Sequence, residues 1–104
     1  MSADLFEPFQ LSDLTLTNRM VMAPMTRNRA DENGGVTPMM VTYYQQRANA
    51  GLIVTESAPV SPKGVGYPFT PGIYTETQAA SWRPVADAVH SAGSHVFVQL
   101  QHCG

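Results

Sequence analysis

Polar side chains that could bind a small molecule follow three separate apolar segments of this sequence. Thr26 follows "RMVMAPM", Ser57 ends "LIVTES", and Gln99 lies within "HVFVQL". A hydroxyl can donate or accept a hydrogen bond, and the Gln99 amide offers a donor and an acceptor in one plane. These groups could therefore hold the polar edge of a ligand. The pattern alone favours a simpler interpretation, in which they are strand-end residues satisfied by turns and neighbouring backbone.

The histidines and the single cysteine do not have the spacing of a metal site. His102 and Cys103 are adjacent, so in an extended segment their side chains point apart, and no second pair is spaced to complete four ligands. His90 and His95 fit a helix end and a strand entry better than they fit metal ligands. We therefore expect no bound metal.

The composition predicts a soluble, cytoplasmic domain. The chain has 104 residues, of which 43% are hydrophobic, as in an ordinary globular domain. Its net charge of −2 gives no case for binding nucleic acid or an anionic membrane. A single cysteine excludes an internal disulfide, and no stretch approaches the roughly 20 apolar residues of a membrane span. The first ten residues lack the features of a secretory signal.

Apolar strands alternate with helices along the chain. We predict, in order, a hairpin over about 5–18, a strand at 19–25, a helix at 37–51, a strand at 52–57, a helix at 75–93 and a strand at 95–100. Thr37 is a plausible N-cap of the first helix, and Gly51 is a plausible C-terminal cap. Thr75 and Gln78 have capping-box spacing at the start of the second helix. Pro84 lies inside that helix, where it should kink the helix or remove a hydrogen bond.

This alternation predicts a parallel α/β sheet with right-handed crossovers. A doubly wound sheet and a (β/α)8 barrel are the two candidates. The first strand is not followed by a G-x-G-x-x-G turn, which a dinucleotide-binding sheet needs. All three strands turn polar at their carboxyl ends, which is where a barrel places its active site. The barrel interpretation is therefore the better one.

Four segments together resemble one family, the Old Yellow Enzymes, also called NADH:flavin oxidoreductases or ene-reductases. They are "NRMVMAPMTRNRA", "YYQQRANAGLIVTES", "GYPFTPGIYTETQAASWRPVADAVHSAG" and "FVQLQHCG". The resemblance implies an FMN-bearing (β/α)8 TIM barrel whose N-terminal hairpin closes its bottom. It also implies hydride transfer from NADPH or NADH to activated alkenes such as enones, maleimides and nitroalkenes. Residues 1–104 would form the N-terminal part of that barrel, with the hairpin at about 5–18 and the strands and helices over 19–104.

The resemblance also implies roles for individual residues at the flavin. It assigns FMN binding to Ala23, Pro24, Met25, Thr26, Ser57 and Gln99. Gln99 would bind the pyrimidine edge of the flavin, and Ser57 would let the backbone approach the ring. Thr26 would place a hydroxyl near the flavin carbonyl, where a hydrogen bond tunes the hydride step. We therefore count Thr26 among the catalytic residues.

Two further positions are implied on the substrate side. Tyr67, in the long loop after the second strand, matches a tyrosine that lines the substrate pocket, and we count it as catalytic and substrate-binding. Gln101 stands where many members have tryptophan, which predicts a wider and more polar pocket. The substrate preferences of those members are therefore not expected to hold for this chain. Arg27 and Arg29 could attract an anionic cofactor, but a solvated loop is the commoner explanation for such a pair.

A barrel of this kind takes about 250 residues, so 104 residues supply only its first three strands. An unclosed parallel sheet exposes two unpaired edges. We therefore expect a second chain or segment to complete the barrel, and we expect this chain alone to be inactive as an ene-reductase. The alternatives are a fragment that binds flavin weakly without turnover, or one that docks on a complementary barrel chain.

Overall fold

A three-stranded parallel sheet organises most of the chain, and a short hairpin precedes it. The computed structural model describes residues 4–104. In chain order the elements are β1 (Phe9–Leu11), β2 (Leu14–Leu16), β3 (Val21–Met22), α1 (Pro38–Gln45), β4 (Leu52–Pro59), the 3₁₀ turn η1 (Pro62–Gly64), α2 (Glu76–Ser81), α3 (Arg83–Ser91) and β5 (His95–Gln101). The strands β3, β4 and β5 pair in that order, all parallel. The predicted order of elements is confirmed, but the strand predicted at 19–25 covers only Val21–Met22, and the second predicted helix is divided in two.

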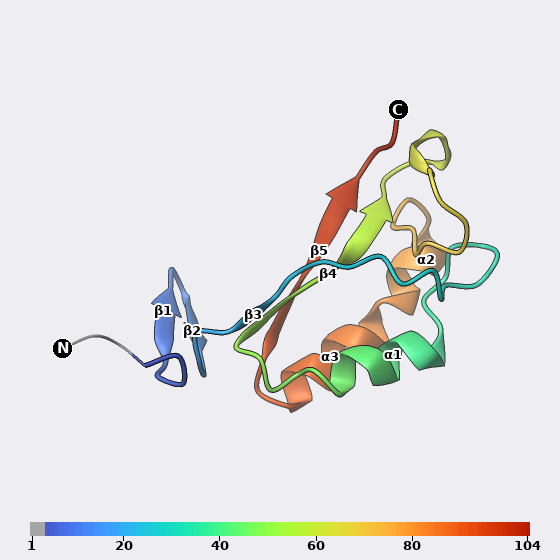
Figure 1. Cartoon of the computed structure of the whole chain (residues 1–104). Coiled ribbons are helices and arrows are strands. Elements are labelled where there is room, and N and C mark those ends of the chain that lie inside the picture. Colours follow the sequence, from blue (N-terminus) through green and yellow to red (C-terminus); the bar gives the residue numbers. More distant parts are fainter. Residues whose placement is uncertain (1–3) are drawn as a thin grey trace.

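The helices of residues 4–104 cover one face of this sheet. Figure 1 shows α1 and α3 side by side along the same side of β4 and β5. Ile53 of β4 lies in the core beneath them, together with Tyr44, Ala48, Ala58, Trp82, Val85 and Val89, and Val96 and Val98 of β5 pack against it. Full burial of a side chain such as Ile53 contributes about 1.5–3 kcal/mol. The burial of this layer therefore fixes the sheet to its helices.

Within residues 4–104 no helix covers the opposite face of the sheet, which we call the open face. Val96 and Val98 point toward the helices. Because side chains alternate along a strand, Phe97 and Gln99 point away from them. By this alternation and the strand register the open face includes Val21, Val54, Ser57, Phe97 and Gln99. Val21 and Phe97 are 54% and 50% exposed. The sheet therefore has one face buried under helices and one face whose side chains are exposed.

The hairpin lies at the amino-terminal ends of the strands (Figure 1). Phe9, Leu11 and Leu16 line a cavity of about 330 Å³ together with Arg19, Val21 and Leu52. The ring Nε2 of His95, at the start of β5, lies 3.3 Å from the carbonyl oxygen of Thr15. The hairpin thus contacts the end of the sheet that is opposite to the polar strand ends.

The first helix ends earlier than predicted, at Gln45 with Gln46 as its cap rather than at Gly51. Gly51 serves a close approach instead, because a Cβ there would collide with the backbone oxygen of Asn18. The Gly51 N–H donates to Asn18 Oδ1 at 2.8 Å. Thr37 occupies the N-cap position, but its hydroxyl donates to the Arg29 carbonyl at 2.9 Å and does not cap the helix.

The predicted helix at 75–93 is two helices that meet at Trp82, which caps both. Pro84 therefore lies in the first turn of α3, where its missing N–H would have had no partner in the helix. The predicted capping contact is confirmed, since the Gln78 N–H donates to Thr75 Oγ1 at 3.0 Å. Gly93 follows α3 with a φ of +85°, the left-handed conformation that ends many helices.

One polar pair is buried in the layer between α1 and β4. The Tyr44 hydroxyl donates to Glu56 Oε2 at 2.6 Å and accepts from the Glu56 N–H at 3.0 Å. Among residues 4–104, Glu56 Oε1 is the one buried side-chain polar atom without a partner. Burial raises the pKa of the Glu56 carboxyl above its ordinary value of 4.5, against the opposing effect of Tyr44 and of the nearby Arg27. Burial and the bond to Glu56 raise the pKa of Tyr44 far above its ordinary value.

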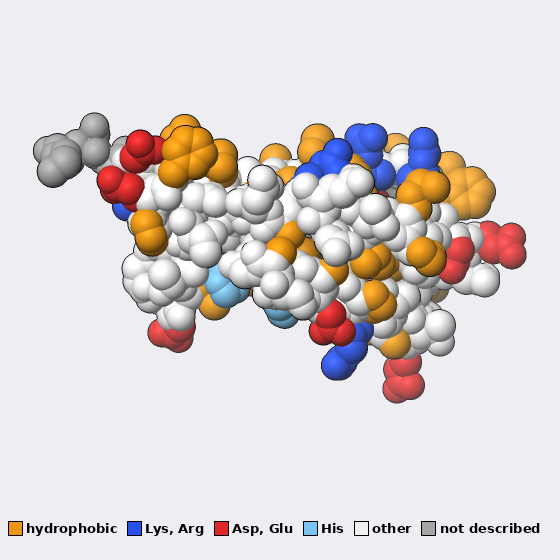
Figure 2. Space-filling view, turned by 90° about the horizontal axis from the view of Figure 1, so that it is seen from below, with side chains coloured by type: hydrophobic (Ala, Val, Ile, Leu, Met, Phe, Trp, Pro, Cys, Tyr) orange, Lys and Arg blue, Asp and Glu red, His pale blue; other side chains and the backbone are white. Residues whose placement is uncertain are grey.

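The helical side of the molecule has the character of an outer surface. Figure 2 shows this side, with apolar side chains in scattered groups between polar atoms and acidic side chains at both ends. None of the helices within residues 4–104 is long and apolar enough to cross a bilayer.

The position of Pro84 gives a first prediction. Proline in a helix interior costs about 3 kcal/mol relative to alanine, so Pro84→Ala would stabilise one continuous helix by that amount. Because Pro84 lies in the first turn of α3, we expect Pro84→Ala to change the free energy of unfolding by less than about 1 kcal/mol in urea denaturation. Ala88→Pro, in the interior of α3, is the control and should cost about 3 kcal/mol or more. A gain of that size in Pro84→Ala would contradict two separate helices.

The raised pKa of Glu56 gives a second prediction. The folded chain holds the proton to higher pH than the unfolded chain, so the associated stability is complete below about pH 4.5 and is lost as pH rises through the raised pKa. We expect the free energy of unfolding of the wild type, relative to Glu56→Gln, to fall over this range. Urea denaturation of both proteins between about pH 4 and 8 measures it. A difference that stays flat or grows with pH would show that the pKa is not raised.

Candidate functional site

Two of the predicted flavin-binding residues meet on the open face. The Ser57 hydroxyl donates to Gln99 Oε1 at 2.6 Å, across paired positions of β4 and β5. Gln99 is exposed, and β4 continues past its predicted end at residue 57 as far as Pro59. Because Ser57 occupies the amide oxygen of Gln99, the amide NH₂ group remains to donate to a ligand. The side-chain oxygen of Gln99 thus binds another side chain, whereas the simpler interpretation has it bound by neighbouring backbone.

The predicted segment after β3 runs beside this pair. Ala23, Pro24, Met25 and Thr26 are all exposed, and Met25 is 46% exposed. Val21 and Met22 pair with Leu52 and Ile53, so the segment continues alongside β4. Arg27, which follows the segment, and Glu56 of β4 line the same cavity of about 160 Å³. The segment therefore lies next to the carboxyl-terminal half of β4, with the Thr26 hydroxyl accessible.

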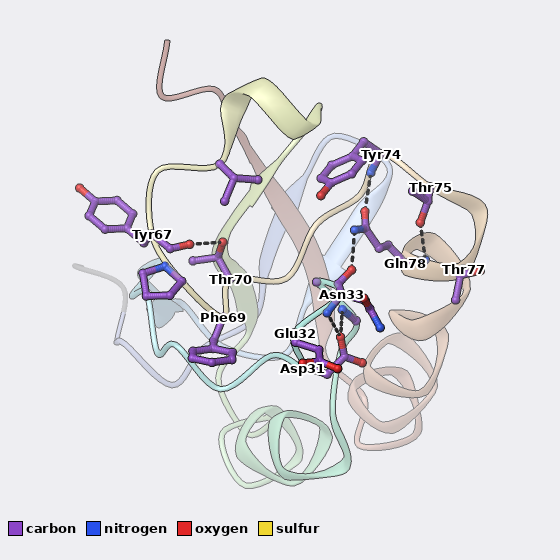
Figure 3. Close-up of a pocket in the computed structure, with 14 residues that line it drawn as sticks. Asp31, Glu32, Asn33, Tyr67, Phe69, Thr70, Tyr74, Thr75, Thr77 and Gln78 are labelled. Carbon is purple, nitrogen blue, oxygen red and sulfur yellow. Dashed lines mark hydrogen bonds between the residues drawn. The ribbon is translucent and has the colours of Figure 1, made fainter.

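Tyr67 lies in a different part of the carboxyl-end loops. It lines an open cavity of about 810 Å³ between the loop at 31–35, the loop at 65–70 and the start of α2. None of the residues at the strand ends lines this cavity, and Tyr67 is 56% exposed. Figure 3 shows its ring at the rim, pointing away from Asn33 and Gln78. Within residues 4–104 the structure thus does not join Tyr67 to Ser57 and Gln99.

Gln78 holds the loops around that cavity together (Figure 3). Its amide NH₂ donates to the Asn33 carbonyl at 2.9 Å, and its oxygen accepts from the Tyr74 N–H at 3.0 Å. A Cβ at Gly34 or Gly72 would collide with the end of this side chain and displace its amide, and Gly34 also has a φ of +75°. Gln78 is only 3% exposed. The Gln78 amide is therefore used in joining the loops around this cavity.

Asp31 fixes the turn of the first loop. Its Oδ1 accepts from the N–H groups of Asn33 and Gly35, each at 2.8 Å. In the second loop Phe69 has a φ of +56°, which is uncommon for a bulky residue. Its carbonyl accepts from the Ala30 N–H at 3.0 Å, which ties the two loops together.

The last residues of the chain also contact a loop. Gln101 Nε2 lies 3.2 Å from Cys103 Sγ, and the Cys103 N–H donates to the Gly64 carbonyl at 3.0 Å. Gln101 pairs with Pro59, two positions past Ser57. Gln101 and Gln99 are therefore both at the carboxyl end of β5. Residues 4–104 hold no cluster of three or more His, Cys, Asp or Glu side chains with metal-binding geometry.

Sequence reasoning missed two residues beside this site, Tyr44 and Glu56. The available signal was a glutamate inside the apolar run "LIVTESA", because a carboxyl group in a buried strand needs a partner. The partner is 12 positions earlier and on a helix, a distance that no local pattern encodes.

Residues 4–104 match the NADH:flavin oxidoreductase / NADH oxidase family. The chain is 45% identical to chanoclavine-I aldehyde reductase fgaOx3 of Penicillium roqueforti, over 96% of this chain and 28% of that protein. It is 47% identical to 12-oxophytodienoate reductase 7 of rice, Oryza sativa subsp. japonica, over 98% of this chain and 26% of that protein. The chain thus spans little more than a quarter of the length of these relatives.

Solved structures give the same result. The old yellow enzyme homologue from Zymomonas mobilis superposes with a TM-score of 0.92 at 44% identity, over 96% of this chain and 28% of that one. Morphinone reductase, in complex with tetrahydroNAD, gives a TM-score of 0.93 at 45% identity, over 99% of this chain and 28% of that one. The hairpin and the three parallel strands with their helices correspond to the N-terminal portion of a (β/α)8 barrel. The chain belongs to the NADH:flavin oxidoreductase / NADH oxidase family, that of the Old Yellow Enzymes.

Proposed function

We propose that this chain supplies one side of an FMN site in an oxidoreductase that takes hydride from NADPH or NADH and reduces activated alkenes. The substrates we propose are enones, maleimides and nitroalkenes. The observation that carries the proposal is the Ser57–Gln99 pair, which presents a free amide donor on the open face at the carboxyl ends of β4 and β5. Membership of a flavin oxidoreductase family supports it.

The residues present fit an isoalloxazine ring, which has flat apolar faces and one polar edge. Gln99 offers the donor for that edge, and the Thr26 hydroxyl is accessible on the neighbouring segment. Met25 and Phe97, 46% and 50% exposed, offer apolar surface nearby. FMN, when bound, would relay the hydride between the nicotinamide and the alkene. The chain's own part is to orient the ring and to keep donors aimed at its polar edge.

Tyr67 and Gln101 would act on the substrate side of the same site. Tyr67 is on a loop that is tied to its neighbours, since the Asn28 amide donates to the Pro68 carbonyl at 2.7 Å. Gln101 lies two residues beyond Gln99 on β5 and therefore on the same face, where its amide would make the pocket polar. We keep both as substrate-binding residues, with the Tyr67 side chain turning inward once the rest of the barrel surrounds it.

A partner that completes the barrel follows from the exposed sheet. Within residues 4–104, β3 and β5 each have one edge that no other strand covers, and the open face has no opposing layer. We propose that a second chain or segment supplies the remaining strands. Without it the chain would be a catalytically incomplete fragment that binds flavin weakly or docks on a complementary barrel chain, which is our second candidate function.

The visible absorption spectrum tests the need for a partner. We expect the purified, desalted chain to lack a flavin band, because it offers only one side of the site. A hybrid in which this chain replaces the matching segment of the Zymomonas mobilis homologue should retain FMN and reduce an enone with NADPH. A flavin band in the chain alone would overturn the need for a partner. A colourless hybrid beside a yellow parent would overturn the proposed FMN site.

Replacement of Gln99 tests the residue that carries the proposal. In the hybrid we expect Gln99→Leu to weaken FMN binding by about tenfold or more, because one hydrogen bond of about 1 kcal/mol is lost and a polar edge is left unpaired. Gln45→Leu, on the exposed side of α1, is the matched control and should leave the affinity unchanged. Fluorescence titration of the flavin measures both. Equal affinities in the two variants would remove Gln99 from the site.

A further inference from the structure

The strand β4 contains one irregularity, and it lies directly before Ser57. Val54 pairs with Phe97, and Ser57 pairs with Gln99. Two residues of β4, Thr55 and Glu56, therefore stand opposite a single residue of β5. This is a β-bulge, which is common beside active sites because it re-aims a side chain.

The bulge decides which face each side chain occupies. In a regular strand Ser57 would point to the face opposite to Val54, because successive side chains alternate. The extra residue shifts the alternation by one, so Val54 and Ser57 both lie on the open face and Glu56 points into the helical layer. Thr55 and Glu56 are accordingly buried, at 0% and 1% exposure. Without the bulge, every side chain after it would change faces.

Two buried hydroxyl groups hold the bulge. The Tyr44 hydroxyl accepts from the Glu56 N–H at 3.0 Å and donates to the carboxylate of the same residue at 2.6 Å. The Thr55 hydroxyl donates to the Glu56 carbonyl at 2.9 Å and lies 3.4 Å from the Gln99 N–H. A bulge leaves backbone groups outside the ladder, and a buried unpaired group of this kind costs about 1–3 kcal/mol. The two hydroxyls thus satisfy both backbone groups of Glu56.

The pair also reaches the segment that carries Thr26. Glu56 and Arg27 line the same cavity of about 160 Å³, together with Arg29, Met39, Met40 and Tyr43. The Glu56 side chain therefore lies between α1, the bulge and the connection that follows β3.

We propose that Tyr44 and Thr55 are positioning residues: their hydroxyls hold the β4 bulge that turns Ser57 onto the open face beside Gln99. The proposal rests on the proposed function where it concerns FMN, but the placement of Ser57 stands on the geometry of this chain alone. Neither residue is on the open face. Each acts through the backbone of Glu56.

The test compares two neighbouring tyrosines of α1. Tyr44→Phe removes the hydroxyl that binds Glu56, whereas Tyr43→Phe changes a ring that packs on the guanidinium groups of Arg27 and Arg47 and keeps that packing. In ¹⁵N-labelled chain we expect Tyr44→Phe to shift the amide signals of Ser57 and Gln99 and to speed exchange of the Glu56 amide proton by about tenfold or more. Tyr43→Phe should leave these signals in place.

Thr55→Val is the second variant, and it serves also if Tyr44→Phe does not fold. It preserves shape and removes the other hydroxyl, so it should disturb the same two signals. A folded Thr55→Val or Tyr44→Phe protein with unchanged Ser57 and Gln99 signals overturns the proposal. In the wild type, a Glu56 amide that exchanges as fast as an unstructured peptide overturns it as well.

FMN titration of the hybrid separates this proposal from the proposed function. We expect Tyr44→Phe to weaken FMN binding by about tenfold, with Tyr43→Phe unchanged. If the wild-type hybrid does not bind FMN, the proposed function fails while the amide signals still decide the role of the two hydroxyls. If Tyr44→Phe shifts the amide signals of Ser57 and Gln99 but leaves the FMN affinity unchanged, the hydroxyls hold the bulge as proposed. The proposed link between the bulge and FMN binding is then overturned.

Discussion

The alternation of side chains along β4 and β5 is the constraint on which the rest of the structure depends. One set of side chains builds the core with α1 and α3, and the other set forms the open face. Both sets are on the same two strands, so a change in register would exchange core and site. The core therefore does more than stabilise the fold. It fixes the direction of the groups that form the candidate site.

The carboxyl ends of the strands are arranged by bonds within the loops. Gln78 and the carbonyl of Phe69 bind backbone groups of neighbouring segments, and Asp31 binds backbone N–H groups within its own turn. Gln78 and Asp31 also line the cavity of about 810 Å³, so their side chains serve the loops. The Ser57–Gln99 pair lies outside that cavity, and its amide still has a donor to offer. Because two of the residues predicted at the flavin meet there, the pair is the stronger candidate site.

Much of this arrangement could be predicted from the sequence, and the failures have physical causes. The hairpin and the parallel strands follow from apolar runs and strand-end polarity, which are local signals. The meeting of Ser57 with Gln99 depends on the bulge in β4, which no local pattern marks. The predicted end of α1 at Gly51 was wrong because that glycine serves a contact with Asn18, 33 positions away. Pro84 looked anomalous because the break at Trp82 has no marker of its own. The Tyr44–Glu56 pair depends on tertiary contact. The substrate-binding role of Tyr67 and the barrel-completing partner stay predictions.

The joint between α2 and α3 gives the chain a built-in optical reporter. Trp82 is its single tryptophan, is 6% exposed, and donates its indole N–H to the Gly72 carbonyl at 3.2 Å. The ring also lies 6.4 Å from that of Tyr44. One fluorophore thus contacts the helix joint, the loop before α2 and the tyrosine that binds β4. Its emission wavelength reports on solvent access at the point where these three segments meet, without any label.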